Sequence, residues 1–311
     1  MNHIDKMYKK IVNIEIQGAT NVCEAVLMTL KKIAADRKAK DARALIKKLH
    51  QAGHYLIRAR ATEPMAVNAV RFIDFHLDRH RDLSVAKLRV LISRAIGSFL
   101  FDLSNNRKII ADQGDGLIRR GDNIFTHCHS STVIDILKHA HKSKKKIRVF
   151  NTETRPLFQG RTTSKDLVKA GISNTQVVDS AGPFFVSNFS TGYNMDILIL
   201  GCDAISRSGD AVNKIGSFGL ALAARQSNIP LYVATQSLKL DVGAAHLENL
   251  ELEKRMAREV WPTAPEGLKI VNYAFDIIPA AYISGYITEL GIIRPRYLAK
   301  RVFKKYKFLK L

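Results

Sequence analysis

Residues 195–203, MDILILGCD, decide the fold predicted for the second half of the chain. The run is apolar on both faces of an extended segment, which is typical of a strand buried inside a parallel sheet. A helix-like stretch, SFGLALAARQ, follows at 217–226. A buried strand followed by a helix is the repeating unit of a doubly wound α/β domain. We therefore predict that Asp203 lies at the carboxyl end of a strand, where such sheets bind ligands.

The same alternation continues on both sides of this run. Further short apolar runs lie at 122–128, 146–152, 175–180, 229–236 and 268–275, and further helix-like stretches lie at 130–142 and 163–171. Together they predict a Rossmann-like, doubly wound parallel sheet domain.

The first 110 residues carry helical periodicity instead. Apolar residues recur at helical spacing, with Lys and Arg on the remaining face, over 19–41, 41–61, 67–80 and 83–114. The predicted fold class is α/β, with a helical N-terminal domain followed by the sheet domain. We place the two domains at residues 1–115 and 116–311.

Composition narrows the class of protein. With 311 residues and 46% hydrophobic content, the chain is large enough for two cored domains. It has no uninterrupted apolar run of the roughly 18 residues that a membrane helix needs. The N-terminal residues lack the apolar core of a secretory signal, and three cysteines fit a reducing cytosol. We expect a cytoplasmic protein.

The chain is strongly basic, with 49 Lys and Arg against 28 Asp and Glu. Such a charge favours either a polyanion such as RNA or a phosphorylated small molecule as the ligand. Basic residues concentrate at 138–148 and 294–310, and in the second segment they alternate with Tyr and Phe, a pattern that suits a phosphate backbone. The favoured interpretation of that tail is an amphipathic helix that packs on its own domain or on a second subunit through Leu298, Val302, Phe303 and Tyr306.

Cys128 is the first candidate for chemistry, in the segment THCHSSTVIDIL at 126–137. It is predicted at the end of a strand, with Ser130 or Ser131 capping the next helix. The helix N-terminus would lower the pKa of the thiol and make it reactive, whereas the alternative is a small buried residue. The neighbouring histidines point away from Cys128 on an extended segment, which argues against a zinc site. We expect no metal.

Two loops beyond predicted strands carry polar side chains. The first, 151–161, places Arg155 and Gln159 around Pro156, and it suits either a polar ligand or a solvated turn. In the second, 200–224, Asn213 and Lys214 precede a predicted helix N-terminus at Ser217, which favours an anion such as phosphate. For Asp203, the alternative to a role in the site is that its side chain caps a helix or a turn.

The helical half has two further candidates. Gly18 lies in EIQGATN, where a helix starts, and Arg60 and Glu63 flank Pro64 in RATEPMAVNAV. Both segments can direct N–H groups or a guanidinium at a phosphate, and ordinary capping is the alternative.

Four segments together resemble one superfamily, which contains ribose-1,5-bisphosphate isomerases, methylthioribose-1-phosphate isomerases and the regulatory subunits of initiation factor 2B. These segments are ETRPLFQGR (153–161), GCDAISRSGDAVNKIGS (201–217), YVATQSLK (232–239) and AFDIIPAAYISGYITELG (274–291). The resemblance implies a helical N-terminal domain joined to a Rossmann-like domain.

Within this superfamily, the isomerases resemble the chain in carrying both Cys128 and Asp203, which the regulatory subunits usually lack. Ala204 after this aspartate resembles the pattern of the archaeal ribose-1,5-bisphosphate isomerases. Methylthioribose-1-phosphate isomerases usually have an arginine at this place. RATEPM resembles an archaeal RPTEP pattern with Ala61 in place of proline. Gln17 departs from the family, many of whose enzymes have an arginine at this place.

The resemblance implies isomerisation of ribose 1,5-bisphosphate to ribulose 1,5-bisphosphate, in an archaeal-type nucleoside-monophosphate salvage route. Cys128, as thiolate, would take the C2 proton and Asp203, protonated by burial, would serve the ring oxygen, or the two roles would be reversed. Substrate-binding roles fall on Gly18, Ala19, Arg60, Arg155, Gln159, Asn213, Lys214 and Lys239.

The resemblance also implies a homo-oligomer, a dimer or a trimer of dimers, with no metal or organic cofactor and with AMP as a candidate activator. Two alternatives stay open: a non-catalytic regulatory subunit that binds proteins or RNA, and a methylthioribose-1-phosphate isomerase.

Overall fold

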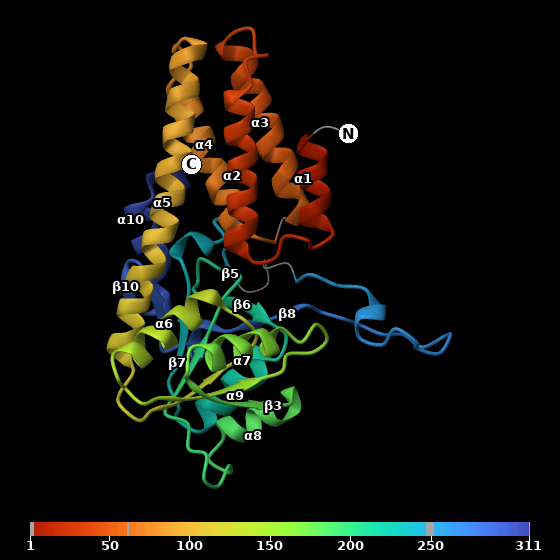
Figure 1. Cartoon of the computed structure of the whole chain (residues 1–311), viewed down its shortest axis with the longest axis vertical. Helices are drawn as coiled ribbons and strands as arrows, with labels where there is room; N and C mark the ends of the chain where they lie inside the picture. Colours follow the sequence, from red (N-terminus) through yellow and green to blue (C-terminus); the bar gives the residue numbers. More distant parts are fainter. Residues whose placement is uncertain (1–2, 61, 247–251, 311) are drawn as a thin grey trace. The chain divides into compact units, whose positions relative to one another are not determined.

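The computed structural model describes residues 3–60, 62–246 and 252–310, which form two compact units (Figure 1). Unit 1 holds the residues up to Asn105 together with Leu238–Val242 and the residues from Val302 onward. Unit 2 holds Asn106–Ser237 and Gly243–Arg301. The sequence suggested a single division at residue 115. In the structure, unit 1 also contains two short segments from the second half of the chain.

Unit 1 is helical, as the periodicity predicted. Its elements are α1 (His3–Val12), α2 (Ala19–Ala35), α3 (Ala42–Ile57), η1 (Arg58–Arg60), α4 (Pro64–Arg79), the first part of α5 (Val85–Leu117), most of η3 (Ser237–Lys239), the end of α10 (Pro295–Lys305) and η7 (Lys307–Leu309). Local sequence sets the helix starts. The Asp41 side chain accepts a hydrogen bond from the Ala44 N–H, and Pro64 takes the first position of α4.

One buried amide holds the segment 238–242 in unit 1. The Asn68 side chain on α4 is buried and donates to the carbonyls of Leu238 and Leu240, each at 2.8 Å. The tail is held by apolar contact, since the ring of Phe308 packs edge-on against Phe72 with centroids 5.2 Å apart.

The tail packs on its own chain, as the amphipathic pattern predicted. Leu298 and Val302 are fully buried, while Phe303 and Tyr306 are half-buried. The apolar side of this segment is therefore used inside the fold.

Unit 2 is built on a seven-stranded sheet of order β10-β9-β7-β4-β1-β2-β3. Its strands are β1 (Asn123–Thr126), β2 (Arg148–Thr152), β3 (Ser173–Val177), β4 (Ile197–Leu200), β7 (Leu231–Ala234), β9 (Gly285–Thr288) and β10 (Gly291–Ile293). All neighbours are parallel except β9 and β10. The chain winds outward from β1 in one direction to β3 and in the other to β9, so the predicted doubly wound sheet is confirmed.

Helices cover both faces of this sheet: α6 (Ser131–Lys142), α7 (Gln159–Lys169), α8 (Gly182–Val186) and α9 (Ser217–Gln226). Successive strand residues point to opposite faces. Ile124 accordingly belongs to the core formed with α6 and α7, while a side chain at Gly182 of α8 would lie 3.7 Å from the Phe125 ring. The burial of β1 on both faces explains why its sequence is apolar without alternation.

A second, antiparallel sheet contains β5 (Ala204–Ile205), β6 (Ala211–Lys214) and β8 (Phe275–Ile278). The expectation of a strand at 268–275 is wrong, because only Phe275 of that run is in a named strand. Val271 is 59% exposed, so the run is not buried as a central strand must be. Residues 285–288 and 291–293, which form β9 and β10, were not singled out as strands from the sequence.

Among the described residues, no helix combines the length and apolar character that crossing a membrane requires.

Replacing Asn68 by Ala should destabilise unit 1, because it removes the donor from two buried carbonyls. We expect the free energy of unfolding to fall by roughly 2–4 kcal/mol, measured by urea denaturation with circular dichroism. Asn105→Ala, at an exposed position of α5, is the matched control and should leave stability within about 0.5 kcal/mol. Equal stability of the two variants would contradict the bridging role of Asn68.

Candidate active site

Cys128 lies where β1 ends and the chain turns into α6. Its backbone is in the left-handed region, with φ of 65°, and the Ser130 side chain caps α6 by accepting from the Val133 N–H. The end of β4 comes close to this turn, because a side chain at Gly201 would lie 2.7 Å from the Ser130 Cβ. Glycine at 201 therefore allows the β4 end to approach the start of α6.

The expected lowering of the Cys128 pKa is wrong. Its side chain keeps some exposed surface, but the protein around the thiol raises its pKa to about 11, chiefly through burial. Desolvation disfavours the thiolate more than the nearby positive groups favour it. In the free site at neutral pH, Cys128 is therefore a protonated thiol.

One positively and two negatively charged side chains act on this thiol. The charge of Lys214 lowers the pKa of Cys128, and the charges of Asp203 and Asp179 raise it. Lys214 is buried at the end of β6 and lies 4.7 Å from the Phe275 ring centre. No carboxylate of the described residues forms an ion pair with its ammonium. Asp203 follows β4, and its N–H donates to the Val212 carbonyl at 2.8 Å. A thiol, an ammonium and a carboxylate thus gather at one edge of the sheet.

A chain of buried hydrogen bonds positions Cys128 from the side of His127. The His127 Nε2 lies 2.8 Å from the Ile215 carbonyl, which can only accept, so Nε2 carries the proton. Burial lowers the pKa of His127, which favours the neutral ring. Its Nδ1 then accepts from the Thr152 hydroxyl at 2.5 Å, Thr152 accepts from Thr154 at 3.1 Å, and Thr154 accepts from the Cys128 N–H at 3.0 Å.

The carbonyl of Cys128 is held as well. Thr163 on α7 donates its hydroxyl to this carbonyl at 2.8 Å and lies 3.2 Å from the Nδ1 of His129. Both histidines beside Cys128 therefore contact threonine hydroxyls. From the sequence, these histidines were expected only to point away from Cys128, and no sequence signal indicated Thr152, Thr154 or Thr163.

The other predicted binding residues of unit 2 have different surroundings. Asn213 is buried and donates to the Ser217 hydroxyl at 2.8 Å. Gln159 begins α7, and its Oε1 is buried without a hydrogen-bond partner, so it can accept from a ligand. Arg155 is exposed, and its guanidinium donates to the Val260 carbonyl at 2.8 Å. Arg155 follows Thr154, whose hydroxyl accepts from the Cys128 N–H, and its guanidinium reaches the loop that holds Val260. Its substrate-binding role stays a prediction.

The predicted helix start at Ser217 is confirmed, but a protein carboxylate occupies its N–H groups. The Oδ2 of Asp276 accepts from the N–H groups of Gly216, at 2.7 Å, and Phe218, at 3.1 Å. Burial raises the pKa of Asp276 to about 6, while these two bonds oppose that rise. The anion at this terminus is thus Asp276 itself, a residue that the sequence did not single out for the site.

The remaining predicted residues belong to unit 1. Gly18, with φ of 84°, precedes α2, and Ala19 is buried. Arg60 lies 3.4 Å from the buried carboxylate of Glu63, and Lys239 ends η3. Substrate-binding roles for Gly18, Ala19, Arg60 and Lys239 stay predictions.

The two departures from the family pattern also lie in the first half of the chain. Gln17 is exposed and its amide donates to the Ile14 carbonyl at 3.2 Å. Ala61 lies outside the described residues.

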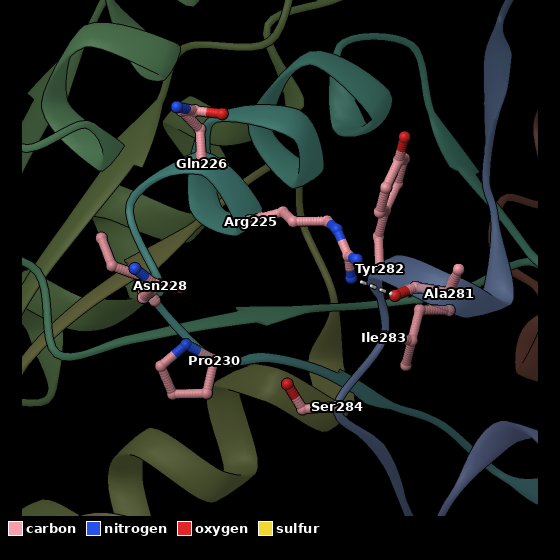
Figure 2. A pocket seen from close by; sticks show the side chains of 9 residues that line it. Arg225, Gln226, Asn228, Pro230, Ala281, Tyr282, Ile283 and Ser284 are labelled. Atoms are coloured by element: carbon pink, nitrogen blue, oxygen red, sulfur yellow. Dashed lines mark hydrogen bonds between the residues drawn. The ribbon is translucent and has the colours of Figure 1, made fainter.

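A hollow of about 680 Å³ lies elsewhere in unit 2 (Figure 2). Pro230 and Ser284, which line it, precede β7 and β9, so it lies at the amino ends of these strands. The guanidinium of Arg225, which lines the hollow, is already hydrogen-bonded within the protein. It donates to the Ala281 carbonyl at 2.8 Å and lies 5.5 Å from the Tyr282 ring centre. Parallel sheets of this kind bind ligands at the opposite, carboxyl ends.

Sequence comparison finds relatives over nearly the whole chain. Residues 15–295 match the profile of the Initiation factor 2 subunit family. The ribose 1,5-bisphosphate isomerase of Methanocaldococcus jannaschii is 37% identical, over 97% of this chain and 96% of that protein. The enzyme of the same name from Archaeoglobus fulgidus is 33% identical, over 95% and 91%. A methylthioribose-1-phosphate isomerase from Geotalea uraniireducens is also 37% identical, but over 76% of this chain and 72% of its own.

Solved structures share the fold. The translation initiation factor eIF-2B of Pyrococcus horikoshii OT3 superposes with a TM-score of 0.80 at 26% identity, over 95% of this chain and 98% of its own. The 5-methylthioribose 1-phosphate isomerase of the same organism gives 0.78 at 24% identity, over 98% and 87%, a likeness of fold alone.

Alkylation of Cys128 by iodoacetamide should be slow at neutral pH, because only the thiolate reacts and the pKa of the thiol is raised to about 11. The rate should rise about tenfold for each pH unit between about 7 and 10, followed by mass spectrometry of the Cys128 peptide. Cys128→Ser should abolish this modification, and the buried Cys23 and Cys202 provide internal controls. A rate that levels off near neutral pH would contradict the raised pKa.

Neutralising Asp203 or Lys214, which act on Cys128 with opposite signs, should move its alkylation rate in opposite directions. Asp203→Asn removes the negative charge, lowers the pKa of the thiol and speeds alkylation at pH about 8. Lys214→Met removes the positive charge, raises the pKa and slows alkylation under the same conditions. Asp102→Asn, an exposed position on α5, should change nothing. Rates that shift in the same direction in both site variants would refute this arrangement of charges.

Proposed function

The chain belongs to the Initiation factor 2 subunit family, and we propose that it converts ribose 1,5-bisphosphate to ribulose 1,5-bisphosphate. Its curated relatives of similar length include ribose 1,5-bisphosphate isomerases, which supports an aldose–ketose isomerase. The observation that carries the proposal is the set formed by Cys128, Asp203 and Lys214. It offers two groups for proton transfer beside a buried cation that suits a phosphorylated substrate.

The protonation state of Cys128 favours one of the two orders of roles. A thiol whose pKa is about 11 is a proton donor at neutral pH, so Cys128 donates its proton to the ring oxygen of the substrate. Asp203 then takes the proton from C2. This is the reverse of the order considered first, in which Cys128 begins as a thiolate, and the reason is the burial of the sulfur.

The steps balance with these two groups alone. The Cys128 thiol gives its proton to the ring oxygen as the bond from that oxygen to C1 breaks. Asp203 takes the C2 proton, and the electrons of that bond form a C1–C2 double bond. The Cys128 thiolate, stabilised by Lys214, then takes the proton of the C2 hydroxyl, while Asp203 returns its proton to C1. The product is a 2-ketose, and both groups regain their starting states.

The reaction moves protons and electrons within one molecule, so it consumes no external oxidant or reductant. We keep the expectation that no organic cofactor takes part and that the protein is a homo-oligomer, either a dimer or a trimer of dimers. AMP as an activator stays part of this proposal.

The two candidate isomerase activities differ in the substituent on C5 of the substrate, which is a phosphate in one and a methylthio group in the other. A second phosphate adds negative charge, which suits a chain of net charge +21. Among matches that cover more than nine tenths of the chain, the ribose 1,5-bisphosphate isomerase of Methanocaldococcus jannaschii is 37% identical and a methylthioribose-1-phosphate isomerase is 31% identical, which supports the same choice. A methylthio group would instead need an apolar contact.

Purified full-length protein should turn over ribose 1,5-bisphosphate, with the ketose product followed directly. Cys128→Ser and Asp203→Asn should each lower kcat by at least about a hundredfold, because each removes a proton-transfer group. Cys23→Ala and Asp102→Asn are the matched controls and should keep wild-type rates. Faster turnover of methylthioribose 1-phosphate would assign that substrate instead. Turnover of neither substrate would favour the non-catalytic subunit.

A further inference from the structure

Two histidines of unit 1 face a carboxylate on the neighbouring helix. His50 and His54 are one turn apart on α3, so they lie on the same side of that helix. The Nδ1 of His50 lies 2.8 Å from the Oδ1 of Asp74 on α4, and the Nε2 of His54 lies 3.1 Å from its Oδ2. Asp74 therefore lies between the two imidazoles.

The geometry points to a binding site for a divalent transition-metal ion, with Zn²⁺ as the ion that this donor set favours, held by His50, His54 and Asp74. One ligand atom from each residue lies within 4.8 Å of the other two. Zn²⁺ binds imidazole nitrogen and carboxylate oxygen at about 2.0–2.2 Å, so small side-chain rotations bring the three atoms to bonding distance. Two histidines and one carboxylate leave a fourth position for water.

A second carboxylate lies near the imidazole of His50, beyond hydrogen-bond distance. Asp78 lies one turn beyond Asp74, and its Oδ1 is 3.8 Å from the Nε2 of His50. Histidines that bind a metal through one nitrogen usually donate the other N–H to a carboxylate, which orients the ring. Asp78 is itself held by Arg81, at 2.6 Å. His50 thus has one nitrogen directed at the metal position and the other at an anchored carboxylate.

The site is accessible from solvent. His54 keeps 58% of its side chain exposed, while His50 and Asp74 keep 29% and 19%. An ion can therefore enter without opening the helix pair. Once bound it would cross-link α3 to α4, which are joined in sequence only through η1 and the residues after it. Binding to the folded state alone stabilises that state.

The alternative is a hydrogen-bonded His–Asp–His cluster that binds no metal. Both arrangements use the same three side chains, and they differ in whether an ion replaces the protons that the imidazoles share with Asp74. Metal binding by each variant separates them, whatever reaction the protein catalyses.

The test titrates the full chain with Zn²⁺ alone by calorimetry and repeats thermal unfolding with and without the ion. We expect one equivalent bound per chain and a raised unfolding temperature. His54→Gln and Asp74→Asn, which keep polar side chains, should weaken binding at least about tenfold. His141→Gln, at an exposed position outside this cluster, is the matched control, and Cys128→Ser excludes binding through the candidate active site.

Co²⁺ provides a second readout, because thiolate ligands give strong charge-transfer absorption that nitrogen and oxygen ligands lack. We expect d–d bands without thiolate bands, lost in Asp74→Asn. Absence of Zn²⁺ binding by the wild type overturns the proposal. So does equal binding by the wild type, His54→Gln and Asp74→Asn, which would place the ion elsewhere.

Discussion

The buried hydrogen-bond chain from the Cys128 N–H to the Ile215 carbonyl is the constraint on which the candidate site depends. It passes through Thr154, Thr152 and His127, and every donor and acceptor direction follows from the one carbonyl at its end. Each buried polar group left without a partner would cost roughly 1–3 kcal/mol. These hydrogen bonds therefore link the ends of β1 and β2 to the residue that follows β6. They also hold Cys128 in a left-handed conformation that few residues other than glycine adopt.

The same burial sets the chemistry of the thiol. A helix N-terminus stabilises an anion by roughly 0.3–1 kcal/mol at an exposed position, which is a small effect beside the desolvation of a buried thiolate. Lys214 and Asp203 then act on Cys128 with opposite signs. The thiol remains protonated at neutral pH, and a cation is already in place for the thiolate that forms when the proton leaves. This combination suits an acid that must donate first and accept later.

Unit 1 uses polar contacts of a different kind. Asn68 joins α4 to a distant segment through two backbone carbonyls, and His50, His54 and Asp74 join α3 to α4 through side chains alone. The first contact is buried and gathers chain from the second half of the sequence. The second is accessible from solvent and has the donor atoms of a metal site.

The sequence by itself determined the class of each region, because helical periodicity and runs apolar on both faces report directly which side chains must be buried. It also located Cys128 and Asp203, since residues that follow apolar strands lie at one edge of a parallel sheet. The prediction of a strand at 268–275 was wrong because apolar content alone does not distinguish a buried strand from an exposed segment, such as the one that contains Val271. Only the tertiary structure decided the raised pKa of Cys128, the partners of His127, the capping of α9 by Asp276 and the hydrogen bond from Arg155 to the Val260 carbonyl. Each of these depends on groups distant in sequence, whose desolvation and hydrogen bonds exist only after the elements pack together.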